Sequence, residues 1–160
     1  MHRIRGFQPE DLPRLRELTI QCFDGVSIDQ NIERELGTIA GIGWQERKAA
    51  HIEEDCRVNP AGVFVVEVQG DVVGYISTRL NPSTRIGWIP NLAVDPRFRR
   101  HGLARALFAH AFAYLRASGM LAVRIETLEQ NAVGRAFYPQ LGFRETARQI
   151  HYVKPLTEEP

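Results

Sequence analysis

The sequence predicts a single α/β domain with a mixed β-sheet and the element order β-α-α-β-β-β-α-β-α-β-β. Three observations support this fold class. The length of 160 residues suits one domain. No repeat, low-complexity tract or long polar linker divides the chain, so we expect one domain over residues 1–160. Apolar residues alternate along short runs in the middle of the chain and follow helical spacing on either side of it.

The N-terminal part of the chain is predicted to be one short strand followed by helices. Pro9 suits the first turn of a helix, and Glu10 and Asp11 favour the positive end of its dipole. Asn59-Pro60 ends the last of these helices, because proline disfavours a helical conformation in the residue before it. The expected elements are a strand at 2–7, a helix at 8–23, a short helix near 29–36 and a helix at 44–57.

The middle of the chain has the pattern of a β-hairpin followed by a third strand. The β-branched runs at 63–68 and 72–77 flank the turn residues Gln69-Gly70-Asp71, which is typical of a hairpin. The third strand is expected at 87–94. Pro90 lies inside it, and because proline cannot donate to a sheet ladder, it predicts a bulge or an edge position.

The last third of the chain is predicted to contain a helix, a strand, a second helix and a closing hairpin. The first helix covers 103–118, with its apolar side chains on one broad face and Gly119 as its C-terminal stop. A strand at 121–127 and a helix that opens near Asn131 follow. The run from Phe143 to Lys154 is expected to form the closing hairpin.

Composition and charge exclude several classes of protein. Hydrophobic residues make up 44% and charged residues 24% of the chain, which argues against a disordered or fibrous protein. The net charge of +1 argues against a nucleic-acid partner. Cys22 and Cys56 form neither a disulfide framework nor a metal-spaced cluster, so we expect no metal. Without a signal-peptide pattern or a membrane-length apolar stretch, the expectation is a cytoplasmic protein with no membrane partner.

The segment from Val94 to Arg105 is the most informative part of the sequence. A buried strand ends there, a basic turn follows, and a helix begins at the small residues Gly102 and Ala104. The first turn of a helix offers free backbone N–H groups and a partial positive charge, so it favours an anion such as phosphate. The arginines suited to phosphate are Arg97, Arg99, Arg100 and Arg105. A solvated basic helix start is the alternative interpretation.

The same segment is similar to the cofactor motif of the GNAT superfamily of N-acetyltransferases. The matching residues are Arg99-Arg100-His101-Gly102-Leu103-Ala104 for the R/Q-x-x-G-x-G/A signature, Asn91-Leu92-Ala93-Val94 before it, and Asn131…Tyr138-Pro139-Gln140-Leu141-Gly142-Phe143 after it. The resemblance implies a GNAT-like fold whose central sheet is splayed at a cofactor cleft. It also implies acetyl-CoA as the acyl donor and direct transfer of acetyl to an amine, with no metal.

The resemblance also implies where acetyl-CoA binds. Leu92, Ala93 and Val94 resemble the splayed strand that pairs with the pantetheine arm, and one of their N–H groups would polarise the thioester carbonyl. The pyrophosphate would lie on Arg99, Arg100, His101, Gly102, Leu103, Ala104 and Arg105. Asn131 resembles the asparagine that binds the CoA arm, and a plain helix N-cap is its alternative role.

Tyr138 and Glu126 are the predicted catalytic residues. Transfer to an amine requires a proton to leave the nitrogen and another to reach the departing thiolate. Tyr138 occupies the family position of the acid, with a packed tyrosine as the alternative, and Pro139 is expected to hold it extended. Glu126, 12 residues before Tyr138, is the predicted base or water-holder, and a surface carboxylate paired with Arg124 is the alternative. Asn91 could hold a water molecule or the substrate.

Three titratable residues are expected on the acceptor side. His51, Glu54 and Asp55 share one face of a predicted helix, and they suit a substrate pocket better than a metal site. Trp44 and Tyr75 are either pocket or core residues.

The partners follow from the resemblance only in part. The acceptor is either a small-molecule amine or a peptide or protein N-terminus. Family members often form dimers, so a homodimer is an alternative to a monomer. The alternative function is a non-catalytic acyl-CoA-binding regulatory module, which would need neither Tyr138 nor Glu126.

Overall fold

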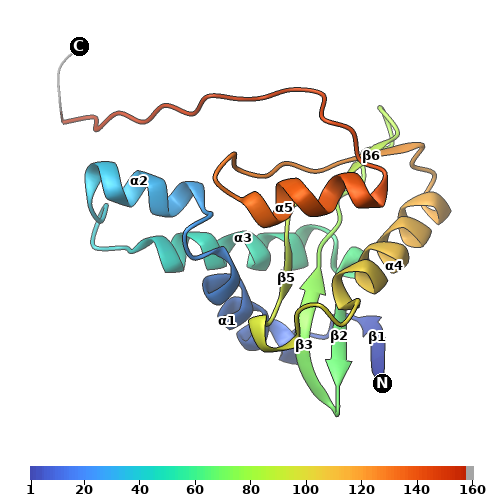
Figure 1. Ribbon diagram of the computed structural model, residues 1–160. Coiled ribbons are helices and arrows are strands. Elements are labelled where there is room, and N and C mark those ends of the chain that lie inside the picture. The colour runs from blue at the N-terminus through green and yellow to red at the C-terminus, as the bar shows by residue number, and fades with distance from the viewer. Residues whose placement is uncertain (158–160) are drawn as a thin grey trace.

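A four-stranded antiparallel sheet forms the centre of the molecule (Figure 1). The computed structural model describes residues 1–157. The strands of this sheet are β1 (His2–Gly6), β2 (Phe64–Val68), β3 (Asp71–Ile76) and β5 (Leu92–Val94), in the spatial order β1-β2-β3-β5. A second sheet pairs β4 (Ile86–Trp88) with β6 (Ala122–Arg124) in parallel. The two together make the mixed sheet that the sequence predicts.

The helices within residues 1–157 agree with those expected from the sequence. They are α1 (Leu12–Phe23), α2 (Ile28–Leu36), α3 (Trp44–Val58), α4 (Leu103–Ala117) and α5 (Ala132–Phe137). Proline begins the short 3-10 turn at Pro9–Asp11 that leads into α1, as a first-turn proline should. None of these helices is long and apolar enough to cross a membrane.

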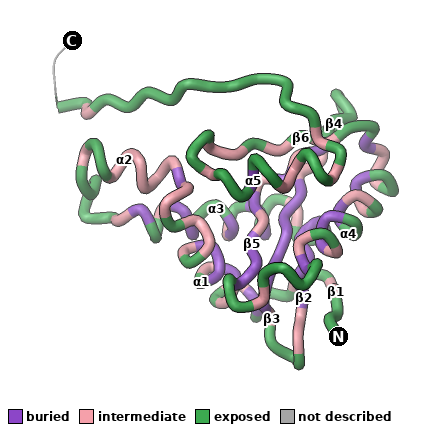
Figure 2. The backbone as a smooth tube through the Cα atoms, viewed as in Figure 1, coloured by how far each residue is buried: buried purple, intermediate pink, exposed green. Residues whose placement is uncertain are grey.

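The side chains of the central sheet enter two separate apolar cores. One core lies between the sheet and the helices α1 and α3, and the other lies between the sheet and α4. Tyr75 and Ala93 belong to the first core, whereas their neighbours Ile76 and Val94 belong to the second, because successive side chains of a strand point to opposite faces. Figure 2 shows the buried residues along β3 and β5, between the helical layers.

The third predicted strand is divided at Pro90. Ile89 still donates its N–H to the Arg124 carbonyl (3.1 Å), which continues the pairing of β4 with β6. Trp88 also exchanges two hydrogen bonds with Arg79, just after β3 (3.0 and 2.8 Å), and beyond Pro90 the Asn91 carbonyl accepts from the Ser77 N–H (2.9 Å). The chain therefore stays beside β3 and its extension across Pro90, while its pairing with β6 ends. Pro90 itself has no N–H to give to either neighbour. The interruption predicted from Pro90 is confirmed, and β5 lies at the edge of its sheet.

The closing hairpin predicted from Phe143 to Lys154 is wrong. The chain there contains no strand and runs as an extended, exposed segment across the top of Figure 1. A tight hairpin needs turn residues such as Asn-Gly, and residues 144–153 contain no glycine, asparagine, aspartate or proline. Ile150 and Tyr152, whose side chains suggested strands, are 79% and 90% exposed.

The strand predicted at 121–127 is confirmed only in its first half, as β6. Its partner β4 ends at Trp88, and after Pro90 the chain keeps its pairing with β3 and leaves β6. Residues 125–127 therefore lose the ladder that would keep them in a strand. This divergence opens the space between β5 and the segment that follows β6.

Candidate active site

β5 is an edge strand that presents backbone N–H groups along its open edge. The Asp95 N–H donates to the Val73 carbonyl (2.8 Å), which fixes the register of β5 on β3. Because backbone groups alternate sides along a strand, Ala93 points its N–H and C=O toward β3. Leu92 and Val94 point theirs toward the open edge. Of the three residues predicted to bind pantetheine, these two offer N–H groups there.

The turn that follows β5 presents unpaired N–H groups at the start of α4. Gly102 caps the helix in a left-handed conformation (φ 76°), and Arg100 is left-handed as well (φ 64°). Ala106 donates its N–H back to the Gly102 carbonyl (3.0 Å). The N–H groups of residues 103–105 have no acceptor in the part of the chain that the structure describes. This geometry is what an anion site at a helix start requires.

The buried carboxylate of Asp95 holds the turn in place. It accepts from the backbone N–H of Arg97 (3.0 Å) and from the Arg97 side chain (2.8 Å), and Arg14 binds it from α1 (3.0 Å). These hydrogen bonds, above all those from the Arg97 side chain, hold the pKa of Asp95 well below its usual range. Arg97, one of the four arginines expected to serve a phosphate, is therefore engaged within the fold.

The other cationic residues of the turn differ in their freedom. Arg99 donates its Nε to the Val94 carbonyl (3.3 Å), and the His101 ring lies against the Arg99 carbonyl (2.8 Å), so both help to shape the turn. Arg100 and Arg105 are exposed, and their side chains have no partner among residues 1–157. These two arginines are the ones free to meet an anion.

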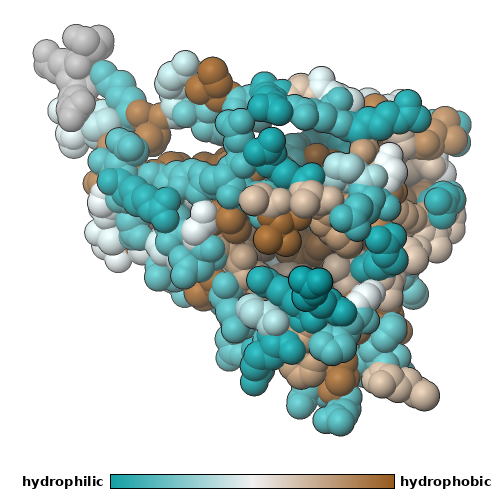
Figure 3. Space-filling model, in the orientation of Figure 1, coloured by the Kyte–Doolittle hydropathy of each residue, from teal (hydrophilic) through white to brown (hydrophobic). Residues whose placement is uncertain are grey.

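A recess lies between α5 and the turn after β5. Figure 3 shows apolar side chains on its floor and hydrophilic ones along its lower rim. Asn131 caps α5 at this side: its Oδ1 accepts from the Gly134 N–H (3.1 Å) and its Nδ2 donates to Thr127 Oγ1 (2.8 Å). The N-cap role is therefore present, and one hydrogen of the amide remains for a ligand.

Tyr138 lies where α5 meets a 3-10 turn (Tyr138–Leu141), inside an aromatic cluster. Its ring contacts Phe108 and Phe143 edge to face, with 6.1 and 6.0 Å between ring centroids. Burial raises the pKa of its phenol, so the hydroxyl stays protonated at neutral pH. No group in residues 1–157 accepts a hydrogen bond from this hydroxyl. Tyr138 thus combines the packed environment with a free proton donor.

The expected effect of Pro139 on Tyr138 is wrong. Tyr138 is helical (φ −60°, ψ −39°) and not extended. Pro139 occupies the first turn of the 3-10 segment, where its missing N–H costs no hydrogen bond. The continuous helical path from α5 into this segment overrides the local preference of the residue before proline.

Glu126 lies just after β6, and two donors hold its carboxylate. Trp88 Nε1 donates to Oε2 (2.6 Å), and Arg124 forms an ion pair with Oε1. The Arg124 guanidinium also stacks on the Trp88 ring, 4.6 Å from its centroid. The ion pair with Arg124 that the sequence offered as an alternative is therefore present. A basic role for Glu126 would use the lone pairs that these donors leave.

A buried polar network joins α3 to the residue before β5. The Asn91 side chain donates to Asp55 (2.6 Å) and accepts from Lys48 Nζ (2.8 Å). Asp55 also accepts from Ser77 Oγ (2.7 Å) and Arg79 Nη2 (2.6 Å). Burial lowers the pKa of Lys48 to about 8. Asn91 is thus a structural link, which is a different use from the water or substrate contact that its position suggested.

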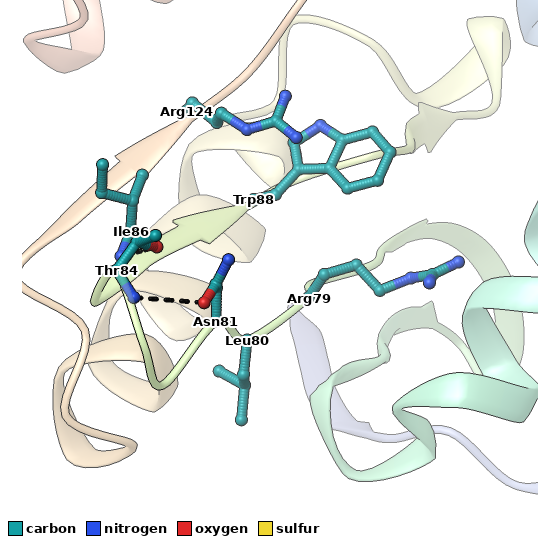
Figure 4. Close-up of a pocket in the computed structure, with 7 residues that line it drawn as sticks. All are labelled: Arg79, Leu80, Asn81, Thr84, Ile86, Trp88 and Arg124. Carbon is teal, nitrogen blue, oxygen red and sulfur yellow. Dashed lines mark hydrogen bonds between the residues drawn. The ribbon is translucent and has the colours of Figure 1, made fainter.

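Two cavities lie beside this network and share the side chains of Arg79 and Trp88. The larger, of about 320 Å³, lies under the turn between β3 and β4 (Figure 4). The smaller, of about 220 Å³, is lined by His51, Glu54 and Asp55. The interpretation of these three residues as pocket residues therefore agrees with the structure, whereas Trp44 and Tyr75 are buried in the core. No cluster of three metal-ligating side chains occurs in residues 1–157.

The sequence did not indicate the larger cavity or the polar network. Their residues come from α3, from the segment after β3, from β4 and from β6, and no local spacing connects these elements. The one available signal was the spacing of His51, Glu54 and Asp55 along a helix. The aromatic residue that lines the smaller cavity is Trp88, whereas the sequence had suggested Trp44 and Tyr75 for this role.

Comparison with known proteins identifies the family to which this fold and site belong. A family model described as the acetyltransferase (GNAT) family matches residues 15–143. The chain therefore belongs to the GNAT acetyltransferase family.

Two curated relatives and one solved structure illustrate the similarity. The chain is 31% identical over 117 residues to a mycothiol acetyltransferase of Segniliparus rotundus, covering 70% of this chain and 44% of the relative. It is 31% identical over 107 residues to N-acetylaspartate synthetase of Rattus norvegicus, covering 66% of this chain and 36% of the relative. The chain thus spans less than half the length of these relatives. The PaiA N-acetyltransferase of Thermoplasma acidophilum, in complex with coenzyme A, aligns over 93% of each chain with a TM-score of 0.75 and 18% identity, which shows the fold.

Proposed function

We propose that this chain is an N-acetyltransferase that moves the acetyl group of acetyl-CoA directly to a primary amine. The observation that carries the proposal is the open edge of β5 followed at once by the unpaired N–H groups of the α4 turn. An edge strand can pair with an amide-containing arm, and a helix start can hold a pyrophosphate. A CoA ester needs both. The family supports acetyl transfer, and the name of the N-acetylaspartate synthetase relative supports nitrogen as the acceptor atom.

The binding residues follow from this arrangement. The outward N–H groups of Leu92 and Val94 would meet the pantetheine arm, and one of them would donate to the thioester carbonyl. The N–H groups of residues 103–105 would hold the pyrophosphate, with Arg100 adding positive charge. The free amide hydrogen of Asn131 would bind the arm from α5.

The chain's own groups would move the protons of the reaction. Acetyl-CoA supplies the activated carbonyl. Glu126, or a water molecule that it holds, takes a proton from the ammonium so that the nitrogen lone pair can form the C–N bond. As the C–S bond breaks, the thiolate, whose conjugate thiol has a pKa of about 8.5 by analogy with cysteine, takes the proton of the Tyr138 phenol. The second proton lost by the nitrogen then returns the Tyr138 phenolate to the phenol. The products are an acetamide, a free thiol and one proton released to solvent.

The wider setting of the activity belongs to the same proposal. The acceptor is a small-molecule amine or a peptide or protein N-terminus. We further propose one domain over residues 1–160, a cytoplasmic location, and a homodimer, for which sedimentation of the purified protein is the test.

The test of the proposed function is thiol release from acetyl-CoA with a panel of amines, for the wild-type protein and for Tyr138→Phe. Phenylalanine keeps the contacts with Phe108 and Phe143 and removes only the hydroxyl. We expect kcat to fall about 10²–10⁴-fold while acetyl-CoA binds equally well. Equal turnover would remove Tyr138 from the mechanism. Binding of acetyl-CoA by the wild-type protein with no turnover of any amine would favour the regulatory module.

A further inference from the structure

The larger cavity beside Trp88 is lined with positive charge. The guanidinium of Arg124 stacks on the indole at 4.6 Å from the ring centroid, and that of Arg79 lies 6.0 Å from the same centroid (Figure 4). Asn81 and Thr84 add an amide and a hydroxyl to the lining. Among the described residues, no carboxylate lines this cavity. Stacking on an aromatic ring fixes the plane of a guanidinium, which favours a planar anion.

The smaller cavity contains carboxylates beside the guanidinium of Arg79, which it shares with the larger one. Glu54 and Asp55 contribute carboxylates to its lining, and His51 contributes an imidazole. Asp55 is already engaged by Arg79, Ser77 and Asn91, whereas Glu54 is paired, among the described residues, with Arg57 alone and keeps acceptor sites for a cation. Burial lowers the pKa of His51, with the nearby Lys48 acting in the same direction, so the ring is neutral at pH 7 and does not repel a cation. Pro90 and Asn91 complete the wall. This cavity therefore adjoins the residues that lead directly into β5, where the proposed function places the thioester.

Both arginines of the larger cavity keep donors for an additional anion. Arg79 uses Nε and Nη2 on Asp55 (3.1 and 2.6 Å), and Arg124 uses Nη1 on Glu126. A guanidinium has five N–H donors, so the Nη1 group of Arg79 and the remaining edge of Arg124 are unused by these pairs. The Arg124 side chain is also 55% exposed, so a small ligand can reach it.

We infer that the acceptor of the proposed transferase is a small amine that carries its own carboxylate. The inference rests on the proposed function and deepens it. The ammonium group lies in the smaller cavity beside Glu54, next to β5, and Glu126, which binds Trp88 of the shared wall, takes its proton through a water molecule. The carboxylate lies in the larger cavity against Arg79 and Arg124, and the chain between the two groups passes Trp88, which lines both cavities.

The sizes of the cavities favour a small zwitterion over a peptide. Volumes of about 220 and 320 Å³ fit an amino-acid-sized molecule. A peptide or protein N-terminus brings an ammonium group, but at the corresponding distance it offers a neutral peptide carbonyl in place of a carboxylate. It would leave the unused donors of the two arginines without a charged partner.

The experiment compares matched pairs of acceptors that differ only in charge. Glycine, β-alanine, 4-aminobutanoate and 5-aminopentanoate are each assayed against the corresponding primary amide by thiol release from acetyl-CoA. At the best spacing we expect kcat/KM of the acid to exceed that of its amide by about 10-fold or more. Arg124→Gln should remove most of this preference for the acid over its amide, mainly by raising KM for the acid. The ratio is compared between proteins at one pH, so the different basicities of the two amines cancel.

Arg3→Gln is the matched control, because Arg3 is exposed on β1, at the far edge of the central sheet. It should leave both rates and their ratio unchanged. Equal use of acids and amides at every spacing, or a ratio that Arg124→Gln does not move, would overturn the inference.

A second readout separates this inference from the proposed function. The same acids are titrated into the free protein, and binding is followed by tryptophan fluorescence, to which Trp88 in the shared wall and the buried Trp44 both contribute. Binding that is weakened by Arg124→Gln supports the carboxylate site even where no acetyl is transferred, and the absence of turnover then counts against the proposed function alone. No binding of any acid, together with acetylation of neutral amines, would reject the site and leave the transferase standing.

Discussion

At the scale of single residues, the two predicted catalytic side chains have opposite environments. Tyr138 is enclosed by aromatic rings that raise the pKa of its phenol and leave its hydroxyl without a partner among the described residues. Glu126 is half exposed, and an indole and a guanidinium hold its carboxylate. A protonated phenol in an apolar wall suits a proton donor to a thiolate. The surroundings of Glu126 suit the holding of a water molecule as well as direct proton abstraction.

Lys48 is a buried cation whose ionisation we expect to affect stability. Lys48 is 8% exposed, and its ammonium donates to Asn91 Oδ1 and lies 4.0 Å from the centroid of the Phe23 ring. Loss of water around the charge outweighs the attraction of Asp29 and Asp55, so the pKa falls to about 8. The folded protein therefore binds this proton more weakly than the unfolded chain does.

The pH dependence of stability tests this effect. Because the pKa of Lys48 is lower in the folded state, the free energy of unfolding should rise as the pH increases from about 8 toward 10.5. Below pH 8 the contribution of Lys48 to this free energy should be at its lowest. In urea unfolding at pH 7 and pH 10, the wild-type protein should gain up to about 3 kcal/mol relative to Lys48→Met, which lacks the titrating group. A difference between the two proteins that stays constant with pH would contradict the burial of a charged Lys48.

At the scale of elements, the position of β5 depends on how closely it approaches β3. Gly74 of β3 is paired with Val94, and a Cβ atom at this glycine would lie 2.8 Å from the Ala93 carbonyl oxygen. The clash would be with backbone, which cannot rotate away as a side chain can. Gly74 therefore sets the distance between the two strands and with it the position of the proposed cofactor edge.

Gly74→Ala should destabilise the protein by about 1–3 kcal/mol and weaken acetyl-CoA binding, because β5 must shift to make room. Gly6→Ala is the control: Gly6 also lies on a strand of this sheet, and a Cβ there would meet nothing within 4 Å. Its effect should stay within about 1 kcal/mol. Urea unfolding of both variants, with acetyl-CoA titration of each, checks the prediction. Equal stability of the two variants would mean that the strands are not held at this distance.

The elements themselves were predictable where the signal was local. Proline marked the start of the first helix and the end of α3, Gly119 marked the end of α4, and Pro90 marked the break between β4 and β5. The segment after Phe143 shows the limit of such signals. Its β-branched and aromatic residues favour strands, but a strand also needs a partner and a hairpin needs turn residues, and residues 144–153 supply none.

At the scale of the whole molecule, the candidate site joins parts that are distant in the sequence. The proposed cofactor edge and the anion turn are contiguous, and the residues at 91–94 and the motif at 99–104 therefore predicted them from the sequence. The network of Lys48, Asp55 and Asn91 and the cavities beside Trp88 arise only when α3 packs beside the split between β4 and β5. No spacing along the chain encodes such contacts, so the acceptor side could be located from sequence only through the three residues of one helix face.

The most direct test of the central claim is calorimetric titration of the purified protein with acetyl-CoA, repeated with Arg100→Glu and Arg3→Glu. Arg100 lies in the anion turn with its side chain free among the described residues, and Arg3 supplies the same charge reversal on the exposed edge strand β1. We predict micromolar binding by the wild-type protein and by Arg3→Glu, and binding at least about 10-fold weaker by Arg100→Glu. No binding by the wild-type protein at millimolar acetyl-CoA, or equal binding by all three proteins, would contradict the placement of the cofactor along β5 and the α4 turn.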